Sequence, residues 1–173
     1  MFGEGMPDVS LDDLLPRIKE THWQWQASAW KEVVRQMQFT AIVADRQKVP
    51  TEKTLYVDPS GRKAWAKWIR SNPVRLGFEI AKHDTSPDLS ETEYEELFSR
   101  VDRQFKRVQK AISDRWGACA FIGRHGDVGF PDDEAADRLA LWNSEGYRLL
   151  LEVTHGGRET PIALLLYIAA PAR

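Results

Sequence analysis

The sequence predicts an α+β fold, an antiparallel sheet of about four to six strands packed by helices. Two apolar segments near the C-terminus, residues 147–155 and 161–168, flank a glycine-containing turn and predict a β-hairpin. A capped amphipathic stretch over residues 90–115 predicts a long helix. We therefore expect the hairpin at the core of the sheet, with the 90–115 helix and an N-terminal helix packed on it.

The length favours a single domain over residues 1–173, because 173 residues suffice to bury one core. A polar loop at residues 83–90 offers a possible subdivision. It would separate a tryptophan-rich half, residues 1–85, from a half made of the helix and the sheet, residues 86–173.

Charge and cysteine content narrow the function classes. The 24 basic and 26 acidic residues give a formal net charge of −2, which does not favour nucleic acid as a partner. Cys119 is the single cysteine, so neither an internal disulfide nor a cysteine-based zinc site can form. No motif predicts a cofactor or a metal.

The N-terminus lacks the pattern of a secretory signal peptide. The longest apolar run, near residues 162–170, is about half the length of a membrane span. We therefore expect a cytoplasmic protein without a membrane partner.

The first regular element is predicted to be one helix over residues 17–38, followed by a strand near residues 39–44. Unrolled at about 100° per residue, this helix has two apolar stripes on nearly opposite sides. His22 falls inside one stripe, where a hydrogen-bonded core histidine is expected. The second stripe consists of Trp23, Ala27, Trp30, Val34 and Met37.

The middle segment predicts a strand at residues 54–57, ended by the turn sequence Asp-Pro-Ser-Gly. Residues 63–70 are predicted to form a short helix carrying Trp65 and Trp68, stopped by Asn72-Pro73. Residues 75–81 predict another strand.

The 90–115 helix has the clearest signals. Ser90 and Glu93 form a capping box, and apolar residues then recur on one face for about five turns. A strand at residues 118–123, a glycine-rich loop and a short helix from Pro131 to about Trp142 are expected to follow.

Alternation along residues 147–154 puts Tyr147, Leu149, Leu151 and Val153 on one face of the hairpin. The second strand is apolar on both faces, which predicts a central position. Glu152 is an acid within this apolar sequence. One interpretation is that Glu152 pairs with an arginine, either Arg148 or one from a neighbouring element. The other is that Glu152 lies in a pocket that raises the pKa of its carboxyl group.

The second apolar stripe of the N-terminal helix must be shielded from water by some other surface. Other parts of this chain, such as Trp65 and Trp68, could supply it. A protein partner or a second copy could do so instead, because tryptophan and methionine suit interfaces. A ligand or stacking platform is the third alternative. The partner-binding hypothesis uses Trp23, Trp30, Val34 and Met37.

An enzymatic alternative depends on histidines and acids that could meet at one edge of the sheet. A hydrolase or nuclease-like site of this kind would use imidazole and carboxylate groups as acids, bases or ligands. Its candidate catalytic residues are His83, Asp84, His125, Asp127 and Glu152.

The favoured function is a non-enzymatic protein-binding module, either an adaptor or a bacterial inhibitor of the immunity or antitoxin kind. This expectation combines the lack of a catalytic motif, the near-neutral charge and the surplus of aromatic residues.

Overall fold

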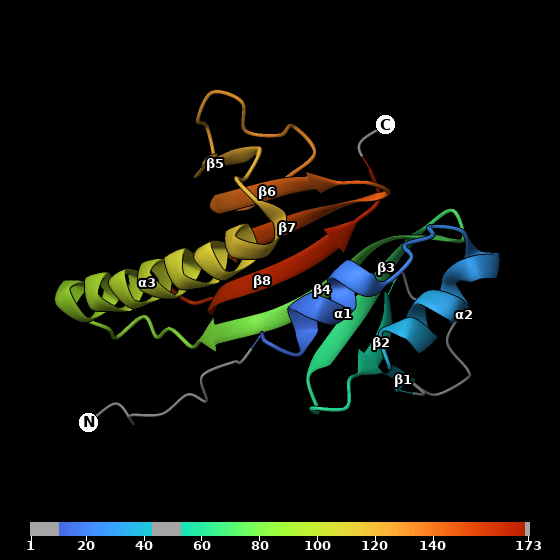
Figure 1. The fold of residues 1–173 in the computed structure, drawn as a ribbon. Coiled ribbons are helices and arrows are strands. Elements are labelled where there is room, and N and C mark those ends of the chain that lie inside the picture. Colours follow the sequence, from blue (N-terminus) through green and yellow to red (C-terminus); the bar gives the residue numbers. More distant parts are fainter. Residues whose placement is uncertain (1–10, 43–52, 172–173) are drawn as a thin grey trace.

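The computed structural model describes residues 11–42 and 53–171 (Figure 1). Within those ranges the chain forms three helices and eight strands. In chain order they are α1 (Leu14–Glu20), α2 (Ala27–Gln36), β1 (Thr40–Ala41), β2 (Lys53–Val57), β3 (Lys63–Ile69), β4 (Asn72–His83), α3 (Glu91–Trp116), β5 (Phe121–Arg124), β6 (Arg138–Ser144), β7 (Tyr147–Thr154) and β8 (Ile162–Ala169).

All eight strands belong to one antiparallel sheet, in the order β1-β2-β3-β4-β8-β7-β6-β5. The α+β class is thus as predicted, whereas the expected four to six strands were too few. The pairing of β4 with β8 joins the strands that precede α3 to those that follow it.

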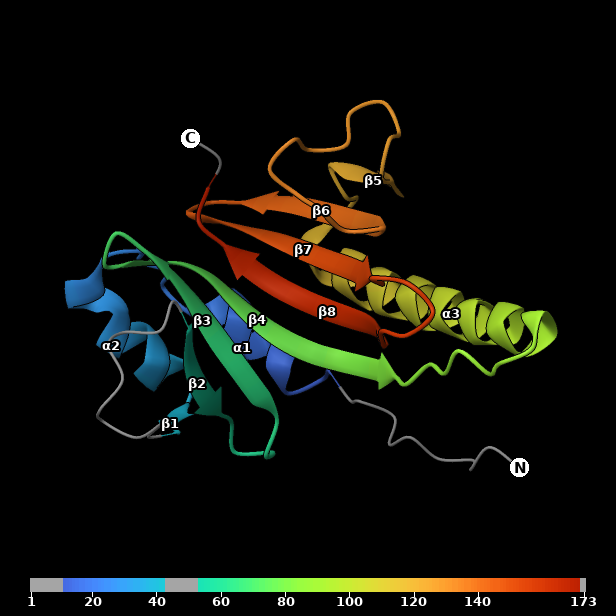
Figure 2. The ribbon, with the colours of Figure 1, turned by 180° about the vertical axis from the view of Figure 1, so that it is seen from behind.

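The helices lie on one face of this sheet, and the opposite face carries no helix (Figures 1 and 2). Helix α3 contacts β6, β7 and β8, while α2 contacts β4. The main hydrophobic core lies between sheet and helices, and its fully buried members include Leu15, Phe78, Phe105, Trp142 and Leu149. We call the other side of the sheet the open face.

The C-terminal hairpin is confirmed in position and in the face that its first strand buries. Strands β7 and β8 pair directly, and β8 lies between β7 and β4 at the centre of the sheet. The four residues predicted to share a face, Tyr147, Leu149, Leu151 and Val153, all point into the main core. A strand with apolar residues on both faces belongs in the interior of a sheet, because both faces are covered there at least in part.

The long helix is confirmed as well. The Ser90 side chain accepts a hydrogen bond from the backbone N–H of Glu93, and the Glu93 carboxylate accepts one from the N–H of Ser90. This reciprocal cap satisfies two donors at the start of α3. Val101, Phe105, Val108 and Ile112 bury the apolar stripe.

The N-terminal helix was predicted wrongly as one element. The chain forms α1 and α2, separated by residues 21–26, and the side-chain oxygen of Gln36 accepts a hydrogen bond from the N–H of His22. This break lets the Trp23 indole donate to the carbonyl of Ile18 at 2.9 Å and become buried. His22 is exposed, so the prediction of a core histidine was also wrong.

Two other predicted helices are strands. Residues 63–69 form β3, in which Ala64 and Ala66 face the core, and residues 138–144 form β6. Pro73 does not stop a helix but lies next to the start of β4, where proline is tolerated. Hydrogen bonding to neighbouring strands overrode weak local helix signals.

Across residues 11–42 and 53–171, none of the helices has the length and apolar character needed to cross a membrane.

Candidate binding site on the open face

The predicted partner-binding residues do not form an exposed surface. Trp23, Trp30 and Met37 are buried inside the monomer, with exposed fractions of 7%, 3% and 0%. Val34 is half-buried and packs against the same core. The two predicted apolar stripes require one continuous helix. Because the helix is interrupted at residues 21–26, these residues do not line up on two opposite faces.

The rest of the chain covers these tryptophans. The Trp30 indole donates a hydrogen bond to the Tyr56 hydroxyl at 3.0 Å and meets Trp68 edge-on, with 6.1 Å between ring centroids. The ring of Trp23 stacks on Trp25 at 5.7 Å. Of the three covers considered from the sequence, the chain's own aromatic residues are the one found.

The predicted catalytic residues are not brought together either. His83 lies on the helix side of the sheet, where its Nε2 is 2.7 Å from the side-chain oxygen of Gln104. Asp84 is exposed beside Lys82. His125 packs on Phe130, and Asp127 accepts a hydrogen bond from the backbone of Arg124.

Glu152, the last of these candidates, lies on the open face. Its neighbours Leu151 and Val153 face the main core, and its register partner Leu139 belongs to the smaller core on the other side of the sheet. The sheet therefore separates Glu152 from His83. In the part of the chain that the structure describes, no three histidine, cysteine, aspartate or glutamate side chains are grouped to hold a metal ion.

The open face instead carries an apolar row that crosses five strands. Its members are neighbours in register from β2 to β7: Leu55, Trp65, Gly77, Tyr167 and Leu150. A Cβ at Gly77 would lie 2.5 Å from the Tyr167 ring and 2.7 Å from the Trp65 ring. Glycine thus allows these two rings to meet edge-to-face above the strand, 5.9 Å apart.

The apolar row is covered at one end only. Near β6 and β7, Phe121 and Phe130 pack on Leu141 and Leu150 in a second, smaller core. Over β2 and β3 no helix lies on this face (Figure 2). Leu55 is 45% exposed there, and Ile69 at the end of β3 is 51% exposed.

A basic row runs beside the apolar row. Lys53 pairs with Lys67, Lys67 with Arg75, and Arg75 with Ala169, which in turn pairs with Arg148. Residues directly opposite one another share a face, and like charges in that position destabilise a sheet. The four cations of this row are Lys53, Lys67, Arg75 and Arg148.

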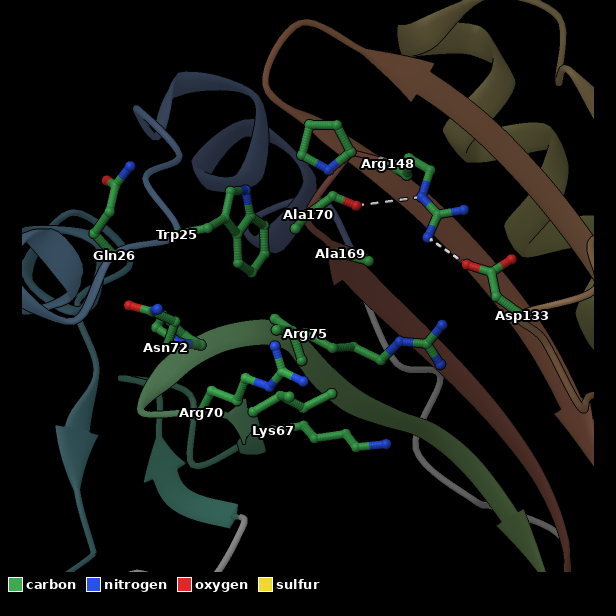
Figure 3. Close-up of a pocket in the computed structure, with 14 residues that line it drawn as sticks. Trp25, Gln26, Lys67, Arg70, Asn72, Arg75, Asp133, Arg148, Ala169 and Ala170 are labelled. Atoms are coloured by element: carbon green, nitrogen blue, oxygen red, sulfur yellow. Dashed lines mark hydrogen bonds and ion pairs between the residues drawn. The ribbon is translucent and has the colours of Figure 1, made fainter. Parts of the chain in front are cut away.

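A cavity of about 900 Å³ opens next to the basic row (Figure 3). Trp25 lies on one side of it and Lys67, Arg70 and Arg75 on the other. The indole N–H of Trp25 donates to the carbonyl of Gly146 at 2.9 Å, which fixes that wall. Among the described lining residues, Asp133 is the one acid.

Arg75 and Arg148 both pair with carboxylates. Nη2 of Arg75 lies 2.5 Å from both carboxylate oxygens of Glu134, and Nη1 lies 3.3 Å from Oε1 of Glu152. Arg148 donates to Asp133 at 3.0 Å and to the carbonyl of Ala170 at 3.3 Å. The arginine that pairs with Glu152 thus comes from β4.

Lys67 and Arg70 differ from these arginines. Neither has an ion-pair partner among residues 11–42 and 53–171. Both are exposed beside the cavity.

Burial raises the pKa of Glu152 to about 7, and the negative charge of Glu134 adds to this effect, while Arg75 opposes it. Burial by itself would lower the pKa of Arg75. The negative charges of Glu152 and Glu134 together have the larger effect, so the pKa of Arg75 is raised. Tyr167, whose ring lies 4.6 Å from the Arg75 guanidinium carbon, has its pKa raised to about 12, chiefly by burial.

The raised pKa of Glu152 predicts a pH-dependent stability. The folded protein binds this proton more tightly than the unfolded chain, whose carboxyl has a pKa near 4.5. The resulting stabilisation is complete below that value and is lost as pH rises through about 7. Urea unfolding measures the free energy of unfolding at each pH. Between pH 4 and pH 8 this free energy should fall more for the unmodified protein than for Glu152→Gln, by at most about 3 kcal/mol. Parallel pH profiles for the two proteins would contradict this.

The sequence analysis singled out Glu152, with an arginine partner and a raised pKa as its two alternatives, but missed Lys67, Arg70 and the cavity. The register that aligns Lys53, Lys67 and Arg75 joins three strands, and β3 had been predicted as a helix. The alternation of Ala64 and Ala66 with larger residues was the signal that could have revealed β3.

Comparison with the profiles of known protein families, with curated proteins and with solved structures finds no match.

Proposed function

We propose that this protein is a protein-binding module that receives a different protein on the open face, over β2, β3 and β4. The observation that carries this proposal is the apolar row, whose members over β2 and β3 have no helix above them (Figure 2). Exposed aromatic and aliphatic side chains with a charged border are typical of interfaces.

The charge beside the apolar row supports a partner other than a second copy. This face presents the cations of Lys67 and Arg70, which have no ion-pair partner among the described residues, whereas the whole chain has a net charge of −2. Two copies meeting through the same face would bring these unpaired cations close to one another, at an electrostatic cost. An adaptor, or an inhibitor of the immunity or antitoxin kind, would use such a surface in the same way.

The test compares two matched surface variants. Leu55→Glu combined with Ile69→Glu adds acids to the open face, and Ile122→Glu adds one to the β5 edge, at a side chain of similar exposure. Partners captured from the source organism are identified and purified, and their affinities are measured directly. We expect the double variant to bind roughly 30-fold more weakly or worse, and Ile122→Glu to bind as the unmodified protein does.

Equal affinities for all three proteins would overturn the proposal. So would light scattering that shows the unmodified protein to be a dimer and the double variant a monomer, because the open face would then bind a second copy.

A further inference from the structure

From the basic row and its cavity, we infer that this site binds the carboxylates of an acidic peptide segment that also carries apolar side chains. The inference rests on the proposed function and names the chemistry of the partner. Three features of the open face support it: uncompensated charge, an unfavourable turn, and the composition of the cavity walls.

The first feature is the charge. Lys67 lies directly between Lys53 and Arg75 in the register of the sheet. Glu134 and Glu152 neutralise Arg75, whereas Lys67 has no such neighbour among the described residues. A bound carboxylate would supply the missing negative charge beside Lys67.

The second feature is the turn between β3 and β4. Ile69 pairs with Asn72, so Arg70 and Ser71 form a two-residue turn with φ of 49° and 65°. Turns of this kind favour asparagine and glycine, because other side chains are strained at positive φ. Arginine at this position adds strain, but it also places Arg70 among the residues that line the cavity (Figure 3).

The third feature is the wall of the cavity. Trp25, Ile69, Pro73 and Val74 supply apolar surface beside Lys67 and Arg70. A guanidinium can hold a carboxylate through two parallel hydrogen bonds. The neighbouring apolar wall suits a peptide side chain better than a sugar-phosphate backbone, which requires a longer track of cations.

The test uses a synthetic hexaglutamate peptide, with hexaglutamine as the uncharged probe and a 12-nucleotide single-stranded DNA as the phosphate probe. Amide chemical shifts of the full chain locate each probe, and their titration gives the affinity at low and at moderate salt. We expect hexaglutamate to shift amides of β3, β4 and the Arg70–Ser71 turn, and hexaglutamine to shift none.

Arg70→Gly and Ser71→Gly form a matched pair. Glycine suits the positive φ at either position, so both variants should unfold at a higher temperature. Arg70→Gly removes a charge, however, and with Lys67→Ala it should weaken hexaglutamate binding roughly tenfold or more. Ser71→Gly should bind as the unmodified protein does.

The inference is overturned if hexaglutamate shifts no amides of the basic row, or if the Lys67→Ala and Arg70→Gly double variant binds it unchanged. Tighter binding of the DNA at the same residues would replace the peptide by a nucleic acid.

The proposed function and this inference can fail separately. A partner that still requires Leu55 and Ile69, while hexaglutamate does not bind, would leave the proposed function standing alone. Hexaglutamate binding that requires Lys67 and Arg70, with a partner indifferent to Leu55 and Ile69, would leave only the anion site.

Discussion

Replacing Arg75 by methionine is expected to lower the free energy of unfolding by about 3–5 kcal/mol at pH 8. The substitution leaves Glu134 and Glu152 without the cation that they share. Their side chains are only 2% and 6% exposed, so water cannot replace it well. Two like charges with little access to water then repel each other. Urea unfolding measures the loss.

The pH dependence of this loss separates charge from packing. The pKa of Glu152 is raised to about 7, so this carboxyl group is largely protonated at pH 5 and the loss should be smaller there than at pH 8. Adding Glu134→Gln and Glu152→Gln to Arg75→Met should restore most of the stability. A loss that is the same at both pH values and persists in the triple variant would contradict this explanation.

Lys67→Met is the matched control. Lys67 lies opposite Arg75 on the same face but is exposed and has no carboxylate partner in the described ranges. Its removal should change the free energy of unfolding by no more than about 0.5 kcal/mol.

Replacing Asp58 by alanine is expected to cost about 3–5 kcal/mol of stability. The Asp58 side chain is fully buried at the turn between β2 and β3. It accepts hydrogen bonds from the backbone N–H groups of Ser60 and Arg62, at 2.9 and 2.8 Å. It also pairs with the guanidinium groups of Arg17 and Arg62, at 3.0 and 2.9 Å.

Removal of this carboxylate leaves two arginines and two backbone donors to be satisfied by other groups. Because Arg17 belongs to α1 and also donates to the carbonyl of Met37, the change should loosen α1 from the sheet. Hydrogen exchange should therefore become faster in α1 than in α3.

Asp13→Ala provides the comparison. Asp13 pairs with the same two arginines, but its side chain is 45% exposed, so its removal should cost no more than about 1 kcal/mol. Similar losses for Asp13→Ala and Asp58→Ala would show that burial does not set the strength of this contact.

The parts predicted well from the sequence were those whose signals are local. The α3 helix has its cap and its apolar stripe within one segment, and β7 and β8 are consecutive strands joined by residues 155–161. The prediction for residues 63–69 was wrong because the helix preference of alanine and lysine is worth only a small free energy, which the pairing of this segment with β2 and β4 outweighs.

The N-terminal tryptophans show the same limit. Their spacing fits a helix, yet the chain breaks at residues 21–26 and buries Trp23 and Trp30 among aromatic residues distant in sequence, such as Tyr56 and Tyr147. Periodicity describes the neighbours of a residue on its own helix but not which distant segment will cover it.

The sequence by itself determined the α+β class, the C-terminal hairpin, the long capped helix and the unusual position of Glu152. The tertiary structure decided which arginine neutralises Glu152, which aromatic residues are buried, and that Lys53, Lys67 and Arg75 form one row. The reason is physical. Caps and hairpins depend on residues a few positions apart, whereas the rows of the open face depend on the register between strands, which the packing of the whole sheet fixes.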